Sequence, residues 1–324
     1  MAKPRYIMDF ERPLIDLETK LADLRRLDLA ENPELATEIE ALAAEIDTLR
    51  IETYHHLSPW DRVQIARHPD RPKTVHYIEE LFTDVVELHG DRTFADDEAM
   101  FAGFATIEGR RVALLGHRKG TNTGENIRRH FGSPSPEGFR KAMRVMRLAE
   151  KFHLPIVSLL DTPGAYPGPE AEERGQAWAI AESLELLSAL RTPVICVGIG
   201  EGGSGGALAI GFGDRLFLLD NAYYSVSSPE ACASIIYRDS SEAESASACL
   251  KMTAEDVVRL GIADEVLPEP LGGAHRNPAA VYDAVRVAIT RSLDEFAAMP
   301  VDELVERRYQ RLRAIGEYCL LDSE

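Results

Sequence analysis

Two glycine-rich segments carry the residues whose spacing could do chemistry. Residues 161–168 (DTPGAYPG) begin where the apolar run IVSLLD ends, and residues 200–207 (GEGGSGGA) directly follow the apolar run VICVGI. Glycine has no Cβ, so an anion can approach the backbone N–H groups of such a segment closely. N–H groups at the start of a helix can hold a phosphate or stabilise an oxyanion that forms during a reaction. The sequence therefore indicates an anion site built from main chain.

A dinucleotide site is one hypothesis for the second segment. Gly198, Gly200 and Gly203 match the pattern G-x-G-x-x-G after a strand, and Asp220 ends the next strand at about the expected distance. However, the helix that follows Gly203 must end before Arg215, which is too short for the usual unit of about 30 residues. This pattern is a weak signal on its own.

A nucleoside triphosphatase is a second hypothesis. Residues 161–164 (DTPG) imitate a D-x-x-G phosphate switch, and residues 200–205 have the spacing G-x-x-x-x-G. A Walker loop then requires Lys and Ser or Thr, but Gly206 and Ala207 occupy those positions. Without the lysine there is no point charge for the β- and γ-phosphates, which disfavours this hypothesis.

An oxyanion site in a crotonase-like fold agrees best with the glycines. Such folds bind thioesters and stabilise an enolate with paired backbone N–H groups, so they can dispense with a catalytic side chain. Ser204 lies between the glycine pairs, and a serine nucleophile would need a histidine positioned by the fold. A crotonase-like thioester hydrolase, or another acyl-CoA enzyme, is therefore the alternative.

Strands and helices that alternate along the chain must position these segments. A strand pair is predicted for MFAGFATI and RRVALLGH, joined at Glu108-Gly109. Further strands are predicted at 156–161, 194–199 and 215–220, and helices at 135–152, 171–190 and 278–316. Apolar strands separated by helices predict a parallel sheet buried on both faces. Ligands bind at the carboxyl ends of such strands, which is where both glycine-rich segments fall.

Residues 1–90 are predicted to form a separate helical region that contacts another subunit, and residues 91–324 the catalytic domain. Leucines and isoleucines recur at three- and four-residue steps on both sides of Asn32-Pro33, which predicts an antiparallel helical hairpin. Ser58-Pro59 is typical of a helix start, with serine as the N-cap. The predicted fold class is α/β with an N-terminal helical hairpin and C-terminal helices.

Composition excludes several other classes. The net charge of −18 over 324 residues argues against a nucleic-acid-binding protein. Cys196, Cys232, Cys249 and Cys319 form no C-x-x-C pair, so no metal is expected in this chain. No signal peptide and no apolar run long enough to span a membrane are found, so a cytoplasmic location is expected.

Several longer sequence segments together point to one particular protein family. In chain order they are GDRTFADDEA (90–99), GHRKG (116–120), IRRHFGSPSPEGFRKAMRVMRLAEKF (127–152), DTPGAYPG, AEERGQ (171–176), GEGGSGGALAIG (200–211), SSPEACASI (227–235) and PEPLGGAHRNP (268–278). Together they closely resemble the alpha subunits of the bacterial multi-subunit acetyl-CoA carboxylase carboxyltransferases. The resemblance covers essentially the whole chain.

The resemblance implies a ClpP/crotonase-type ββα-superhelix core and an alpha-two beta-two heterotetramer with active sites between alpha and beta chains. It implies transfer of the carboxyl group of carboxybiotin, held by the biotin carboxyl carrier protein, to acetyl-CoA. The product is malonyl-CoA, in the first committed step of fatty-acid biosynthesis, and ATP is used on the separate biotin carboxylase. Zinc is expected on the beta subunit.

The resemblance also assigns roles to particular residues. The backbone N–H groups of Gly205 and Gly206 are the expected oxyanion hole for biotin. Substrate contacts are expected from Gly164, Ala165, Gly202, Gly203 and Ala207, and anion contacts from a basic patch of Lys119, Arg128 and Arg129. Asp161 is expected to tie its turn in place rather than to act as a base.

Overall fold

A single mixed sheet forms the centre of the protein. The computed structural model describes residues 6–26 and 34–316, and within them the strands follow the order β1-β2-β3-β4-β5-β6-β8, with β7 paired to β5. The pairs β1–β2 and β2–β3 are antiparallel, and all the pairs from β3–β4 onward are parallel. The strands are β1 (Thr83–Glu87), β2 (Met100–Ile107), β3 (Arg110–His117), β4 (Ile156–Thr162), β5 (Val194–Gly203), β6 (Arg215–Leu219), β7 (Tyr223–Ser225) and β8 (Glu265–Leu267).

The two central strands explain why the apolar runs are continuous. Every residue of β4 and β5 is buried, because helices cover both faces of the sheet. The strand predicted at 194–199 is longer in the structure and reaches Gly203. Glu201 to Gly203 pair with Tyr223 to Ser225 of β7, so half of the glycine-rich segment is strand rather than turn.

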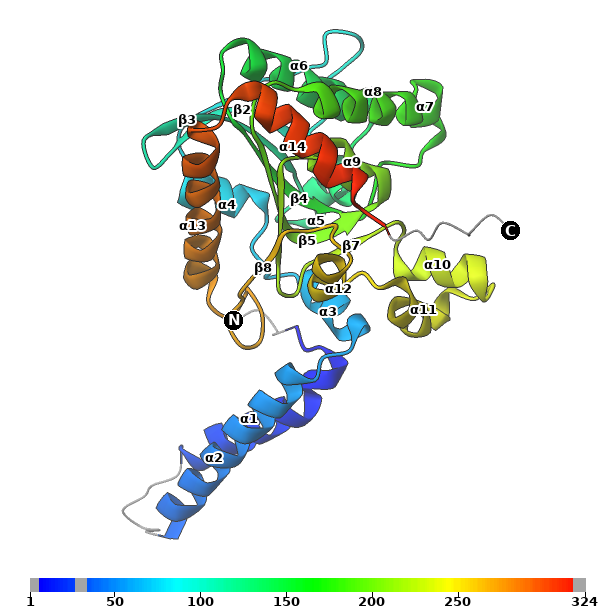
Figure 1. Cartoon of the computed structure of the whole chain (residues 1–324). Coiled ribbons are helices and arrows are strands. Elements are labelled where there is room, and N and C mark those ends of the chain that lie inside the picture. Colours follow the sequence, from blue (N-terminus) through cyan, green and yellow to red (C-terminus); the bar gives the residue numbers. More distant parts are fainter. Residues whose placement is uncertain (1–5, 27–33, 317–324) are drawn as a thin grey trace, which may run out of the picture.

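Helices pack on the two faces of this sheet (Figure 1). On one face α6 (Pro136–Lys151) contacts β2 and α8 (Gln176–Ala189), and α8 contacts α9 (Ser204–Gly211). The other face is covered by α13 (Pro278–Ala297) and α4 (Thr74–Leu81). The remaining helices are α3 (Pro59–Ala66), α5 (Thr123–Arg128), α7 (Pro169–Glu173), α10 (Pro229–Ile236), α11 (Ala243–Leu250), α12 (Ala254–Arg259) and α14 (Val301–Arg313).

Two predicted helices are each broken in the structure. The helix predicted at 171–190 divides into α7 and α8 at Gly175, whose φ of 82° is left-handed. The helix predicted at 278–316 divides into α13 and α14 at Pro300, which cannot donate a helical hydrogen bond. The predicted start at Ser58 is confirmed, since its hydroxyl accepts the N–H of Asp61 at 3.1 Å.

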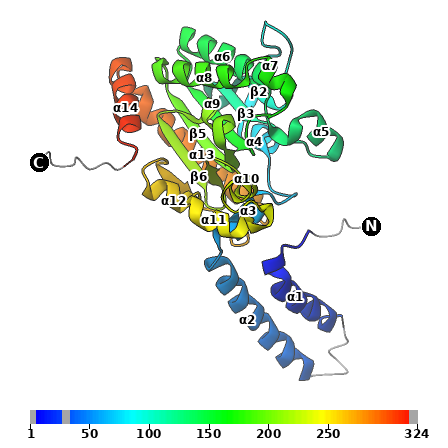
Figure 2. The same cartoon turned by 90° about the vertical axis from the view of Figure 1, so that its right-hand side faces the viewer.

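The N-terminal hairpin extends away from the core (Figures 1 and 2). Its helices are α1 (Arg12–Leu24) and α2 (Glu34–His55), and they bury a small apolar cluster of their own. Arg276 anchors the hairpin because it donates to Glu11, 2.8 Å away, and Tyr54 donates to the same carboxylate. The string PEPLGGAHRNP therefore includes the residue that holds this helical pair to the core.

The sheet begins before residue 91. β1 pairs with β2, and side chains of α4 belong to the main hydrophobic core. Of the described α-helices before residue 91, α1 and α2 are therefore the pair that lies apart from the sheet. The break at Asn32-Pro33 and Cys319 lie outside the described residues. Among the described helices, none is both long enough and apolar enough to cross a lipid bilayer.

Arg308 fastens the last helix to the sheet. Its guanidinium, on α14, is fully buried and binds both carboxylate oxygens of Asp214 at 2.9 and 2.7 Å. It also donates to the carbonyls of Leu187, Leu190 and Thr192 at 2.7–2.9 Å. One side chain thus accepts no bond itself but donates to the backbone carbonyls at the end of α8 and just before β5. β5 is the strand that leads to the glycine-rich segment.

We predict that Arg308→Met lowers the free energy of unfolding by about 3–5 kcal/mol, because it leaves a buried carboxylate and three carbonyls without their donor. Urea denaturation at pH 7 measures the change. The matched control is Arg307→Met, since Arg307 is exposed at the same helix and should change stability by less than about 0.5 kcal/mol. Equal free energies of unfolding for the two variants would show that the hydrogen bonds of Arg308 do not hold α14 on the sheet.

Candidate active site

The two glycine-rich segments touch through their backbones. Thr162 at the end of β4 pairs with Gly202 of β5, which sets the segments side by side. A Cβ placed on Gly203 would lie 2.1 Å from the carbonyl oxygen of Pro163, and one on Gly206 would lie 2.5 Å from the carbonyl carbon of Gly164. Only glycine permits so close an approach at these two positions.

Thr162 fixes the first of the two turns. Its hydroxyl accepts the N–H of Gly164 at 3.1 Å and donates to the carbonyl of the same residue at 2.8 Å. Gly164 has a φ of 149°, a conformation that other residues rarely adopt. The peptide group between Gly164 and Ala165 therefore has a defined direction.

The second segment changes from strand to helix without a loop. β5 ends at Gly203 and α9 begins at Ser204, whose φ of 50° is left-handed and costs about 1–3 kcal/mol for a residue other than glycine. An α-helix offers no intrahelical acceptor to the N–H groups of its first turn, which here include those of Gly205 and Gly206. The positive end of the helix dipole adds to their attraction for an anion.

The structure brings Gly164, Ala165 and Gly206 together, as their predicted roles require. Gly205 is partly exposed beside them. Gly202 and Gly203 are buried within β5, and Ala207 is buried within α9. The close packing around Gly202 and Gly203 accounts for their lack of a side chain, and their contact with substrate stays a prediction.

An apolar cavity of about 430 Å³ opens beside Ser204 and Gly205. The described residues that line it include no histidine and no carboxylate. Its walls include Leu208, Phe212, Tyr224, Val226, Leu250, Val257, Leu260 and Ile262. Lys251 and Arg311 also line it, but Ser204 has no histidine or carboxylate base among these residues, which argues against a serine hydrolase of the Ser-His-Asp type.

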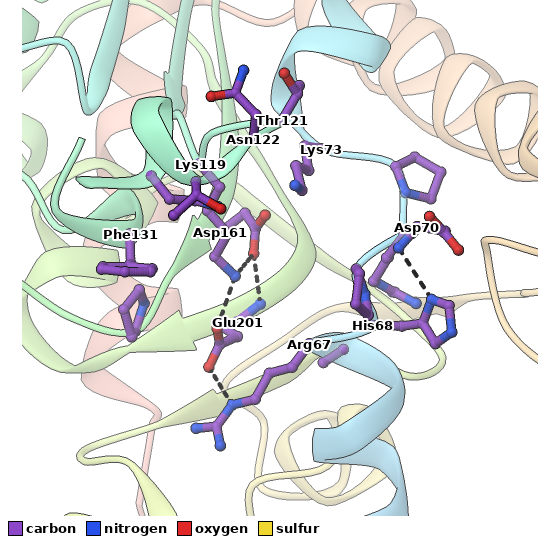
Figure 3. Close-up of a pocket in the computed structure, with 17 residues that line it drawn as sticks. Arg67, His68, Asp70, Lys73, Lys119, Thr121, Asn122, Phe131, Asp161 and Glu201 are labelled. Atoms are coloured by element: carbon purple, nitrogen blue, oxygen red, sulfur yellow. Dashed lines mark hydrogen bonds and ion pairs between the residues drawn. The ribbon is translucent and has the colours of Figure 1, made fainter. Parts of the chain in front are cut away.

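A larger, polar cavity of about 630 Å³ lies on the other side of the glycine-rich segment (Figure 3). At its wall Lys119 points between two carboxylates, with Nζ 2.6 Å from Asp161 and 2.8 Å from Glu201. Glu201 also accepts from Arg67 at 2.8 Å and from the hydroxyl of Tyr223 at 2.5 Å. We call these residues, Arg67, Lys119, Asp161, Glu201 and Tyr223, the ion cluster.

Charge pairing within the ion cluster outweighs the cost of burial. Burial alone would raise the pKa of Glu201, but Lys119 and Arg67 lower it to about 2. Burial likewise opposes the charge on Lys119, yet Asp161 and Glu201 raise its pKa above the usual value. Asp161 also accepts the N–H of Glu201 at 3.1 Å, so from the next-to-last position of β4 it ties down the second glycine-rich segment.

The three predicted basic residues do not form one exposed patch. The side chain of Lys119 is only 14% exposed and its charge is neutralised in the ion cluster. Arg129 is also largely buried and binds Glu125 and the carbonyl of Lys119. Arg128 alone lies at the surface, with 57% of its side chain exposed and Glu98 3.6 Å away. Their role as anion contacts remains a prediction.

Sequence reasoning gave no role to Arg67, His117, Glu201 or Tyr223. A charged residue between an apolar strand and glycines, as at Glu201, is a signal for a buried ion pair. His117 ends an apolar strand and could have been singled out on the same ground. Arg67 and Tyr223 carry no local signal, because their partner lies 134 and 22 residues away along the chain.

Comparison with solved structures defines the class of fold. A transcarboxylase 12S structure matches with a TM-score of 0.55 at 21% identity, over 69% of this chain and 41% of that chain. A Pseudomonas malonate decarboxylase hetero-tetramer in complex with coenzyme A matches with a TM-score of 0.55 at 19% identity, over 68% and 88%. The chain therefore has the mixed α/β fold of these two structures, which confirms the predicted α/β fold class.

Sequence comparison narrows that class to one family. Residues 7–316 match the family described as acetyl co-enzyme A carboxylase carboxyltransferase-like. The acetyl-coenzyme A carboxylase carboxyl transferase subunit alpha of Thermus thermophilus is 48% identical over 96% of this chain and 99% of its own length. That of Thioalkalivibrio sulfidiphilus is 51% identical over 96% and 98%. The chain belongs to the family of acetyl-CoA carboxylase carboxyltransferase alpha subunits.

We predict that Lys119→Met destabilises the protein by about 3–5 kcal/mol at pH 8, because Asp161 and Glu201 lose the cation between them. In the parent protein the pKa of Glu201 is depressed, so its contribution is complete above the unfolded value of 4.5 and is lost only as the pH falls toward 2. In the variant the pKa of Glu201 rises because Lys119 no longer lowers it, so acidification to pH 5.5 should restore part of the loss.

Thermal unfolding at pH 8 and pH 5.5 measures this difference. The control is Lys151→Met at the exposed end of α6, which should show no such pH dependence. If Lys119→Met loses the same stability at both pH values, the loss does not come from repulsion between the carboxylates of Asp161 and Glu201.

Proposed function

We propose that this chain works as the alpha half of a carboxyltransferase that moves a carboxyl group from carboxybiotin to acetyl-CoA, giving malonyl-CoA. Membership of the family over nearly the whole chain supports the reaction. The structural observation that carries the assignment is the first turn of α9, where Gly206 lies against the Gly164–Ala165 turn and its neighbour Gly205 lines the apolar cavity.

The residues at this site suit a biotin ring. A fused bicyclic ring is apolar except for its ureido edge, and the cavity of about 430 Å³ has apolar walls with backbone donors at one side. Biotin supplies a carboxyl group on a ureido nitrogen. The N–H groups of Gly205 and Gly206 would donate to the ureido oxygen and stabilise negative charge on it.

The chain's own contribution is thus electrostatic. Hydrogen-bond donors fixed in advance lower the barrier without reorganising during the reaction, and the apolar walls exclude water that would weaken them. The titratable side chains that line the apolar cavity are Tyr224, Lys251 and Arg311, and the absence of a histidine or carboxylate among the described lining residues agrees with a reaction in which this chain transfers no proton. The base for the methyl group of acetyl-CoA would then lie outside this chain, and biotin without its carboxyl group could supply it.

The other half of the reaction is assigned to a partner. We propose a beta subunit, in an alpha-two beta-two assembly, that holds acetyl-CoA and carries zinc. The biotin carboxyl carrier protein would deliver the carboxyl group from biotin carboxylase, in the cytoplasm. The name "subunit alpha" of the relatives supports the existence of partner subunits. A thioester hydrolase is the weaker alternative because no histidine or carboxylate is among the described residues that line the cavity beside Ser204.

We predict that Gly206→Ala lowers turnover roughly 100-fold or more, since its Cβ would lie 2.5 Å from the backbone of Gly164 and must displace the N–H groups. The variant is mixed with a beta subunit, assembly is checked by size-exclusion chromatography, and biotin-dependent decarboxylation of malonyl-CoA is followed. Gly124→Ala, on the exposed α5 with room for a Cβ, is the matched control. Near-normal turnover by an assembled Gly206→Ala complex would refute the oxyanion assignment.

A further inference from the structure

His117 forms hydrogen bonds with both glycine-rich segments. It is the last residue of β3 and is completely buried. Its Nε2 lies 3.0 Å from the carbonyl oxygen of Gly206, and its Nδ1 lies 3.3 Å from the backbone nitrogen of Asp161. The ring therefore contacts the first turn of α9 and the start of the DTPGAYPG segment at the same time.

The two partners determine the tautomer of this ring. A carbonyl oxygen can only accept, so Nε2 carries the hydrogen and donates it to Gly206. The backbone N–H of Asp161 donates, so Nδ1 must be unprotonated. Burial is the main cause that lowers the pKa of His117 to about 3; the neighbouring charge of Lys119 acts in the same direction, while the bond to Gly206 opposes both. The imidazole is accordingly neutral at physiological pH.

A backbone site made of glycines needs support from outside itself. Glycine has more conformational freedom than any other residue, and Gly205 and Gly206 have no side chains that could hold them in place. Donors must stay within about 0.5 Å of their productive positions to be effective. The bond from His117 fixes the Gly206 carbonyl, which belongs to the same residue as one proposed donor and lies one residue from the other.

We infer that His117 is a positioning residue for the Gly205–Gly206 oxyanion site, acting through its hydrogen bond to the Gly206 carbonyl. This inference rests on the proposed function of that site. His117 is not among the residues that line the apolar or the polar cavity, so it touches no substrate there. It acts only by aiming the backbone of α9.

Two amide substitutions separate the two hydrogen bonds of the ring. Glutamine can place an amide nitrogen near the position of Nε2, so His117→Gln can still donate to Gly206. Asparagine is shorter and can place its oxygen near the position of Nδ1, so His117→Asn keeps only the acceptor for Asp161. A positioning role through Gly206 predicts that glutamine rescues turnover and asparagine does not.

The variants are assayed as assembled complexes with the beta subunit, using biotin-dependent decarboxylation of malonyl-CoA. We expect kcat to fall roughly 10- to 100-fold in His117→Asn with an unchanged KM for malonyl-CoA, since only the aim of the donors is altered. We expect His117→Gln to stay within about threefold of the parent kcat and to keep its pH profile, because the neutral ring transfers no proton. His153→Asn, an exposed residue with a left-handed φ of 55° that asparagine tolerates, is the control.

Three outcomes would overturn the inference. They are equal kcat values for His117→Asn and the parent, equal losses in His117→Asn and His117→Gln, and loss of one limb of the pH profile in His117→Gln. If His117→Asn does not assemble, the kcat and pH profile of His117→Gln decide the matter alone. Failure of the proposed function is seen separately, because the parent complex would then show no biotin-dependent turnover or Gly206→Ala would be fully active.

Discussion

The ion cluster is the interaction on which the site depends. One ammonium group, that of Lys119, lies between the carboxylates of Asp161 and Glu201, and these three residues come from the ends of three adjacent strands or the chain just after them. Two buried carboxylates this close would repel strongly without the cation. Gly200 has to be glycine because a Cβ there would lie 2.5 Å from Asp161. The cluster therefore sets both the spacing of the strand ends and the course of the glycine-rich strand above them.

Because backbone N–H groups are the proposed hydrogen-bond donors, the side chains at this site hold the backbone in place rather than react. The N–H groups of Gly205 and Gly206 are the same in every protein, so their effect depends only on where they are held. Thr162 holds the first turn, His117 holds the first turn of α9, and Asp161 holds the nitrogen of Glu201. The bonds of His117 and Asp161 are buried and join different elements, while that of Thr162 is local, and together they make a flexible segment rigid.

Local signals predicted the elements well, and non-local pairing accounts for most of the errors. The apolar run at 156–161 and the serine N-cap at Ser58 depend on neighbours in sequence, and both are confirmed. β5 was predicted too short because its last residues pair with β7, about 20 residues further on. Lys119 was assigned to a basic patch because its two carboxylate partners lie 42 and 82 residues away, where no periodicity reveals them. The contact between the two glycine-rich segments was expected from the rule that parallel strands end at one edge, and the structure contains it.

The direct change from strand to helix at Ser204 explains why the same segment can border two cavities of opposite character. Pairing with β7 holds the chain extended up to Gly203, with Glu201 at the polar cavity. One left-handed residue then turns the chain into α9, so Ser204 and Gly205 border the apolar cavity. A longer loop would let the first turn of the helix move independently of the strand. With no loop between them, the donors of Gly205 and Gly206 keep the direction that the ion cluster and the sheet impose, and the strain at Ser204 is the energetic cost of that rigidity.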